Sequence, residues 1–188
     1  MVADSIQVQS RFFSENAARL AETAEVIAHI FRTGRKVLLF GNGGSAADAQ
    51  HIAAEFVGRC TLERHPLPAI SLSTDTSALT ALANDYGFEQ IFARQIEALA
   101  QPGDAAIAIS TSGNSPNVLR AIEAARARNL YTIGLTGDGG GKMKDLVEVV
   151  FRVPSSYTPR IQETHIMIGH ILCELVDRLL FPDQYPRD

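Results

Sequence analysis

The chain places His51 and Glu55 four residues apart in a segment with helical spacing, residues 45–60. This spacing brings both side chains to one face of a helix. An imidazole and a carboxylate together can bind a transition metal, and a carboxylate beside a sugar can move a proton between neighbouring carbons. Most pairs of this kind simply lie on helix surfaces, so the interpretation depends on what other segments bring to the same place.

A helical segment near the C-terminus supplies Gln162, His165 and His170. Gln162 and His170 project about 80° apart on a helical wheel. Two histidines and a glutamate, completed by the side-chain carbonyl of Gln162 or by water, would form a reasonable set of zinc ligands. The spacing does not decide whether His165 or His170 is the second histidine. His29 and His65 are most simply a helix-surface and a loop residue.

The loop at residues 110–116, with the sequence STSGNSP, is the clearest candidate for a phosphate site. Its four hydroxyl groups directly precede a helix-length segment that begins with Pro116, a residue suited to a first helical position. Hydroxyl and backbone N–H donors can hold a phosphate without any lysine. A helix N-cap at Ser115 would explain one of these hydroxyl groups but not those at 110–112.

Two other polar segments each allow a structural and a binding interpretation. Residues 41–46, GNGGSA, fit the relaxed dinucleotide fingerprint, which also requires an acid about 20 residues on, at the end of the second strand; the acid nearest that position, Glu63, precedes the second apolar run. The segment also lacks the Gly-Lys-Ser/Thr ending of a P-loop, so a tight turn with glycine at positive φ is the simple alternative. Asn84 and Asp85 predict an Asx turn by default, or polar contacts to sugar hydroxyls.

Short apolar runs alternate with helix-length segments, which is typical of a parallel sheet covered by helices. Most runs are continuous, as expected for strands buried on both faces. Ligands bind at the carboxyl ends of such strands, where the polar loops would gather. We therefore predict an α/β fold, a three-layer α/β/α sandwich. Strands are expected at 36–40, 68–72, 105–109, 131–135 and 147–153, and helices at 45–60, 76–99 (in two pieces), 116–129 and 159–180.

A long helix is expected before this alternation, from Ser5 to Arg32, with Gly34 as its stop. Its length of about 40 Å is more than a small sheet needs, which indicates that one end packs on another subunit. No linker or internal repeat divides the chain. We predict a single domain over 1–188, with the helix in 1–34 and the core in 35–181.

Composition excludes several classes of protein. Seventeen Lys and Arg against 21 Asp and Glu give a net charge of −4, which lacks the basic footprint of a nucleic-acid binder. The two cysteines, Cys60 and Cys173, show no CxxC spacing and are interpreted as small buried apolar residues. No apolar run has the length of a signal peptide or a membrane span, so we expect a soluble, cytoplasmic protein without a membrane partner.

Five segments of this chain closely resemble the bacterial phosphoheptose isomerases, a family of sugar isomerase (SIS) domains with a five-stranded parallel sheet. Each segment alone is generic to sugar-phosphate domains, but their joint occurrence in this order is highly specific. The similarity covers about residues 35–180. The segments are GNGGSAADAQHIAAEFVGR (41–59), ANDYGF (83–88), AISTSGNSPNV (108–118), LTGDGGGKM (135–143) and RIQETHIMIGH (160–170).

The resemblance implies isomerisation of D-sedoheptulose 7-phosphate to D-glycero-D-manno-heptose 7-phosphate through an ene-diol, the first step toward lipopolysaccharide heptose. It also implies a homotetramer with active sites between subunits and one zinc ion per subunit. By position, Glu55 and His170 match the family's acid/base pair. Its zinc ligands match His51, Glu55, Gln162 and His170. Its substrate contacts match Asn42, Gly43, Gly44, Glu55, Asn84, Asp85, Ser110, Thr111, Ser112, Ser115 and Gln162.

Other functions stay open beside this one. A close relative of the family is a non-enzymatic regulator that binds the bacterial replication-initiator protein and lacks the catalytic glutamate and the final histidine, whereas Glu55 and His170 are both present here. A phosphosugar sensor would have no use for these two residues, and an isomerase of another phosphosugar would share all of them. Pro159 stands where some members have an acid or alanine, which bears on substrate fit. Whether Glu55 acts mainly as base or as zinc ligand stays open.

Overall fold

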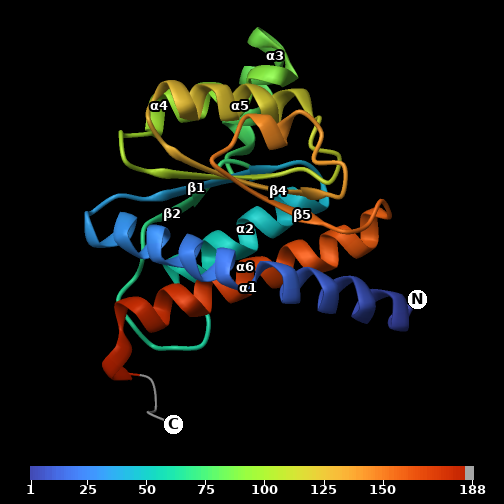
Figure 1. Ribbon diagram of the computed structural model, residues 1–188. Helices are drawn as coiled ribbons and strands as arrows, with labels where there is room; N and C mark the ends of the chain where they lie inside the picture. The colour runs from blue at the N-terminus through green and yellow to red at the C-terminus, as the bar shows by residue number, and fades with distance from the viewer. Residues whose placement is uncertain (185–188) are drawn as a thin grey trace.

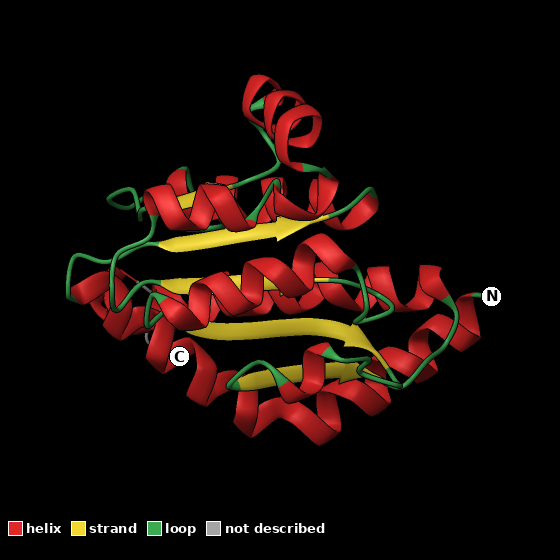
Figure 2. Ribbon diagram, turned by 90° about the horizontal axis from the view of Figure 1, so that it is seen from above, coloured by secondary structure: helices red, strands yellow, loops and turns green. Residues whose placement is uncertain are grey.

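A computed structural model describes residues 1–184 of the chain and arranges them in three layers, with helices on both faces of one sheet (Figure 1, Figure 2). The last four residues of the predicted domain lie outside the described part. The elements are α1 (Val2–Arg32), β1 (Val37–Gly41), α2 (Gly44–Val57), β2 (Ala69–Ser71), α3 (Thr76–Tyr86), α4 (Ala93–Leu99), β3 (Ala105–Ile109), α5 (Pro116–Ala127), β4 (Tyr131–Gly137), β5 (Val149–Val153) and α6 (Thr158–Leu180), with 3₁₀ turns at Phe88–Gln90, Met143–Asp145 and Pro182–Gln184.

The strands form a parallel sheet in the order β2-β1-β3-β4-β5. β1 and β3 are buried at every position, which accounts for their continuous apolar runs. Successive side chains of β1 point to opposite faces, so Val37 and Leu39 pack with α1, α2 and α6 while Leu38 and Phe40 pack with α4 and α5. The predicted fold class, a three-layer sandwich around a five-stranded parallel sheet, is confirmed.

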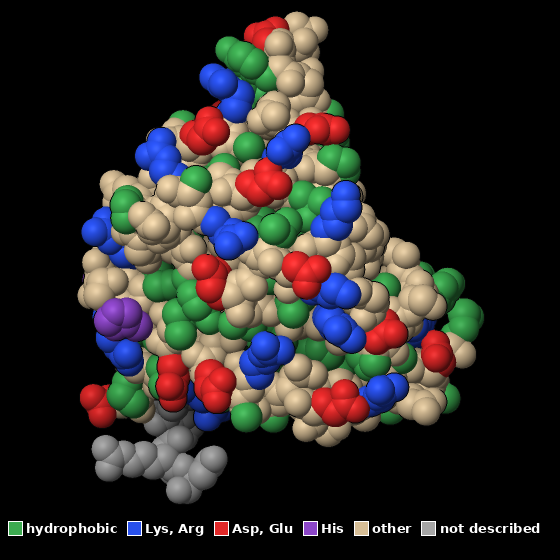
Figure 3. All heavy atoms as spheres, turned by 45° about the horizontal axis from the view of Figure 1, so that its top comes forward, with side chains coloured by type: hydrophobic (Ala, Val, Ile, Leu, Met, Phe, Trp, Pro, Cys, Tyr) green, Lys and Arg blue, Asp and Glu red, His purple; other side chains and the backbone are tan. Residues whose placement is uncertain are grey.

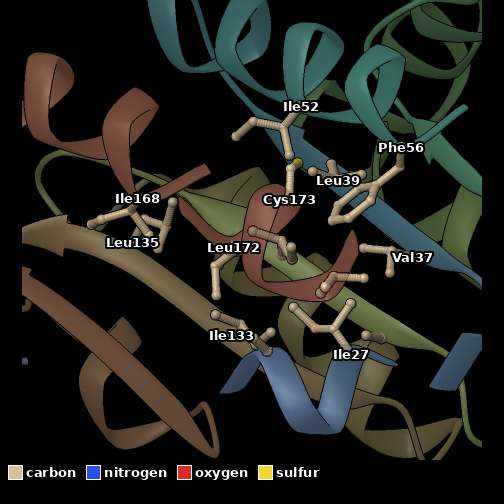
Figure 4. Packing of buried hydrophobic residues seen from close by; sticks show 14 of the residues in the cluster. Ile27, Val37, Leu39, Ile52, Phe56, Ile133, Leu135, Ile168, Leu172 and Cys173 are labelled. Atoms are coloured by element: carbon tan, nitrogen blue, oxygen red, sulfur yellow. The ribbon is translucent and has the colours of Figure 1, made fainter. Parts of the chain in front are cut away.

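On the face of the sheet covered by α1, α2 and α6, the core joins these three helices to the strands (Figure 4). Ile27 of α1, Ile52 and Phe56 of α2, and Leu172 of α6 belong to one buried cluster. Cys173 of α6 is buried among them, as predicted. Cys60 packs against the same cluster but is only partly buried, so the prediction that it is a buried residue is wrong. Cys60 lies three residues beyond the end of α2.

Some predicted element boundaries are wrong by a few residues. The clearest case is β5, where the carboxylate of Glu148 accepts hydrogen bonds from the backbone N–H and hydroxyl of Thr132 in β4. A side chain therefore takes the place of backbone pairing before the strand begins. β5 begins at Val149 rather than at 147, α1 begins at Val2 rather than Ser5, α2 ends at Val57 rather than Cys60, and α5 ends at Ala127 rather than 129.

The predicted helical stretch 76–99 is divided in two, as expected, because Gly87 with φ 86° ends α3. No residue of α3 is buried, and the helix projects from the body of the molecule (Figure 1, Figure 2). Asn84 and Asp85 lie in its last turn. The predicted Asx turn at these residues is therefore wrong, since the helix continues through them to Tyr86.

On the face seen in Figure 3, Lys and Arg side chains are interspersed with Asp and Glu, and that face carries no continuous basic surface. The exposed fraction of His65 and His29 agrees with their interpretation as loop and helix-surface residues. Within residues 1–184, none of the helices combines the length and the apolar character needed to cross a membrane.

Candidate active site

Two glycines allow α2 and α6 to approach closely. A Cβ at Gly169 of α6 would lie 2.5 Å from Ile52 Cδ1 of α2, and a Cβ at Gly44 would lie 2.7 Å from Gln162 Nε2. Both distances are shorter than real Cβ contacts, so any larger residue would force a neighbour to move. The close approach brings the polar residues of the two helices face to face.

His51 of α2 and His170 of α6 meet across this contact. Their Nε2 atoms are 2.9 Å apart and their rings stand nearly perpendicular, at 80°. The Glu55 carboxylate lies 3.6 Å from His51 Nε2. Glu55 is largely buried whereas both histidines reach the surface, so a ligand from solvent can approach all three groups. We call His51, Glu55 and His170 the α2–α6 seam.

The donor chemistry of the seam fits a zinc ion. Two nitrogens bound to one tetrahedral zinc at about 2.0–2.1 Å would lie about 3.3 Å apart, close to the observed separation. The carboxylate of Glu55 supplies an oxygen donor on the same side. Within residues 1–184, however, no three His, Cys, Asp or Glu side chains already surround a common point as ligands. The seam therefore offers convergent donors, not a closed metal cage.

The thiol of Cys60, close to Glu55, is held in its neutral form. Burial raises the pKa of the Cys60 thiol to about 12, and the nearby carboxylate of Glu55 adds to the shift. The thiol therefore keeps its proton near pH 7. Asp48 lies one turn before His51, and burial raises the pKa of its carboxyl while the charge of His51 lowers it.

The loop between β3 and α5, residues 110–115, gathers hydroxyl groups. Ser110 Oγ lies 2.9 Å from Ser115 Oγ and 3.4 Å from Ser112 Oγ. Ser115 is the N-cap of α5, but its side chain makes no capping bond, so the helix N-terminus keeps free N–H donors. Hydroxyls and a helix N-terminus together suit a phosphate. We call residues 110–115 the hydroxyl loop.

Backbone contacts fix the shape of the hydroxyl loop. Gly113 has φ 63°, and a Cβ there would lie 2.1 Å from the Gly140 carbonyl oxygen. The Gly113 carbonyl accepts a hydrogen bond from the N–H of Met143 (3.0 Å), and the Thr111 carbonyl accepts one from the N–H of Gly137 (3.0 Å). The backbone that carries the hydroxyl groups is thus fixed by hydrogen bonds to the end of β4 and the segment after it.

Comparison with known proteins shows the family of the chain. Residues 2–137 match the family model of the SIS domain. A phosphoheptose isomerase of Nitratidesulfovibrio vulgaris is 53% identical over 178 residues, covering 95% of this chain and 86% of that protein. One from Nitratiruptor is 64% identical over 156 residues, covering 82% and 83%. The solved phosphoheptose isomerase of Neisseria gonorrhoeae superposes with a TM-score of 0.88 at 43% identity, covering 94% of each chain. The chain belongs to the phosphoheptose isomerase family.

Three of the residues that match the family's substrate contacts lie between β1 and α2, beside the hydroxyl loop: Asn42, Gly43 and Gly44. The amide of Asn42 exchanges two hydrogen bonds with the amide of Asn117 on α5, at 2.9 and 2.8 Å. Gly43, with φ 56°, begins α2 without a side-chain cap. The N-termini of α2 and α5 therefore lie at the same carboxyl edge of the sheet as the hydroxyl groups.

Gln162 lies beside the N-terminus of α2 and not beside His51 and His170. Its amide contacts the position of Gly44, and within the described chain it makes no hydrogen bond to His51, Glu55 or His170. Along α6 it is about 12 Å from His170. Its place is compatible with a substrate contact. The ligand role that the family assigns to it has no contact supporting it within one chain.

Asn84 and Asp85 are the phosphoheptose isomerase positions that the single chain leaves apart. Both are exposed on α3, and the Asn84 amide donates to the Asp85 carboxylate at 2.8 Å. His165, which spacing could not separate from His170, faces away from the seam. It is buried, and its Nε2 lies 3.2 Å from the carbonyl oxygen of Thr136 in β4. Burial lowers the pKa of His165 to about 4, so it is neutral near pH 7.

Two groups of residues have no counterpart in the sequence predictions. Asn117 is buried and fixes Asn42. Arg64, from the loop after α2, forms a buried ion pair with Asp177 of α6. Each partnership joins residues far apart in the chain, so no local spacing marks it. A charged or amide residue in an otherwise apolar setting, such as Asp177 in the last turns of α6, was the only signal in the sequence.

Proposed function

We propose that this chain interconverts D-sedoheptulose 7-phosphate and D-glycero-D-manno-heptose 7-phosphate. The observation that carries the proposal is the approach of His51, Glu55 and His170 from two helices, in a chain that also carries a loop of hydroxyl groups suited to a phosphate. The names of relatives at 53–64% identity support the substrate. The product would be a cytoplasmic precursor of lipopolysaccharide heptose.

In this proposal the hydroxyl loop and the N-terminus of α5 bind the phosphate. The carboxylate of Glu55 takes a proton from C1 of the ketose and returns it to C2, while His170 moves the hydroxyl proton between the two oxygens. His51, Glu55 and His170 would hold a zinc ion, one per subunit. Gln162 matches the fourth zinc-ligand position of the family. A bound zinc ion would polarise the substrate carbonyl and stabilise negative charge on its oxygens.

We further propose that the active enzyme is a homotetramer with sites between subunits. The support is the position of Asn84 and Asp85, which project on α3 where a neighbouring chain can receive them. The long α1 offers a second surface for assembly. Light scattering on the eluting protein tests this, with the mass of four chains as the expected result and a monomer as the contradicting one.

The activity is tested by incubating the purified chain, supplied with zinc, with sedoheptulose 7-phosphate and following the aldose by NMR. Glu55→Gln, which keeps the shape of the side chain, is run in parallel, with the exposed Glu63→Gln as a matched control. Turnover in the parent and control that is lost in Glu55→Gln supports the proposal. No turnover in a folded parent would indicate a phosphosugar sensor, a regulator or an isomerase of another substrate.

A further inference from the structure

Glu55 stands in the last turn of α2, where carbonyl groups have no partner within the helix. The guanidinium of Arg64 supplies those partners. Its Nη2 donates to the Glu55 carbonyl oxygen at 2.9 Å, and its Nη1 donates to those of Phe56 at 2.7 Å and Gly58 at 3.0 Å. A cation at the C-terminal end of a helix is also favoured by the helix dipole. Arg64 therefore fixes the end of α2 that carries Glu55.

Arg64 is itself anchored to the other helix of the site. Its Nε donates to Asp177 Oδ1 at 2.9 Å, and both side chains are completely buried. Asp177 lies two helical turns beyond His170 on α6. One guanidinium thus joins the turn that carries Glu55 to the helix that carries His170.

Stability alone does not account for this arrangement. Desolvating two charges is costly, and replacing a buried ion pair with apolar side chains of similar volume is often neutral or stabilising. The second oxygen of Asp177, Oδ2, is buried without a partner, so even the pair itself is incompletely satisfied. What an apolar pair cannot do is hold several backbone carbonyls of α2 in place.

We propose that Arg64 and Asp177 are positioning residues of the isomerase reaction, which hold the Glu55 turn of α2 at a fixed place relative to His170. The inference rests on the proposed isomerase function. Proton transfer depends steeply on the placement of the base, and a misplacement of about 1 Å caused by a change far from the chemistry can cost about 100-fold in rate. Because the phosphate is bound by a different segment, the hydroxyl loop, loss of the pair affects kcat and leaves KM nearly unchanged.

The test is the double variant Arg64→Met with Asp177→Leu, which removes the charges together and keeps apolar volume. We expect a folded protein that is less stable than the parent, because the carbonyl groups that Arg64 binds lose their partners, with kcat lower by about tenfold or more and KM within about threefold. The matched control is Lys36→Met with Asp104→Asn. It removes another largely buried ion pair, with Lys36 Nζ 2.6 Å from Asp104 Oδ2, between the residues that precede β1 and β3. Its kcat is expected to stay at the parent value.

Unchanged kcat in a folded Arg64/Asp177 double variant would overturn the inference, as would an equal loss in the control. If the double variant does not fold, Arg64→Lys is measured instead, because it keeps the charge but replaces the forked donor. A kcat about threefold or more below the parent, at unchanged KM, is then expected; parent kcat would overturn the inference. If the parent itself shows no turnover, the proposed function has failed and this inference falls with it, an outcome distinct from the other two.

Discussion

In the α2–α6 seam, the facing histidines stand 119 positions apart in the chain and meet only because two helices pack closely. In the hydroxyl loop, the donors stand within six consecutive residues and are shaped by their own backbone. The seam carries groups that accept and donate protons, whereas the loop carries neutral hydroxyls. From this difference we propose a division of roles, in which the loop binds the phosphate and the seam transfers the proton.

The largest effect is expected from Glu55→Gln. The amide cannot accept a proton, so kcat should fall by about a thousandfold while KM changes by less than about threefold, since the phosphate contacts are untouched. Steady-state kinetics with sedoheptulose 7-phosphate measure both constants. A comparable rise in KM would mean that the seam also provides much of the binding, and the division would be wrong.

A pH effect follows from His165, which joins α6 to the loop side of the molecule through Thr136. Its pKa is about 4 in the folded chain against an ordinary value of 6.5, so between these values the unfolded chain binds the extra proton. Stability due to neutral His165 is complete above pH 6.5 and is lost as pH falls toward 4. The loss is about 3 kcal/mol. Urea unfolding at several pH values should show a shallower acid decline in His165→Asn than in the parent.

The control for that measurement is His29→Asn, an exposed histidine at the end of α1. Its acid decline should match that of the parent. If His165→Asn and the parent lose the same free energy of unfolding between pH 7 and pH 4.5, His165 is not held neutral by burial.

Removal of one hydroxyl group from the loop should affect binding. Ser112→Ala is expected to raise KM by about tenfold, the usual size of a hydrogen bond to a charged group, with kcat within about threefold. The exposed Ser14→Ala on α1 serves as control and should leave both constants unchanged. A Ser112→Ala enzyme with lowered kcat and unchanged KM would reverse the assignment of the two regions.

The smallest effect is expected from Gly169→Ala, which pushes α6 away from Ile52 of α2. Overpacking costs about 1–3 kcal/mol, but alanine regains about 1 kcal/mol of helix propensity, so stability changes little. The shifted helix should lower kcat by about fivefold. Thermal melting and kinetics together check this; a fall in stability with unchanged kcat would show that the spacing of the helices is not critical for the reaction.

Much of this arrangement could be predicted from local patterns. The apolar runs marked the strands, Gly34 marked a helix end and Pro116 marked a helix start, because each of these two residues restricts or frees its own backbone dihedral angles. The hydroxyl loop was predictable for the same reason. The spacing of His51 and Glu55 placed them on one face of α2 but could not say which histidine of α6 they meet.

The remaining features depend on packing between distant segments. Which of His165 and His170 meets His51 depends on the face of α6 that packs against the sheet, because that face buries His165. The Arg64–Asp177 pair forms only because the loop after α2 folds back onto α6. Asn84 and Asp85 were placed in a turn because their residue types favour turns, yet α3 runs one residue further, to Tyr86, before Gly87 ends it. In each case tertiary context overrode or completed a local preference.

The central claim is tested most directly by calorimetric titration of Glu55→Gln with sedoheptulose 7-phosphate in D₂O, followed by NMR of the recovered sugar. The account predicts binding within about threefold of the parent's KM and no deuterium at C1 or C2, because the loop still holds the phosphate while the proton acceptor is gone. Loss of binding, or deuterium incorporated at the parent rate, would contradict the division between a binding loop and a reacting seam.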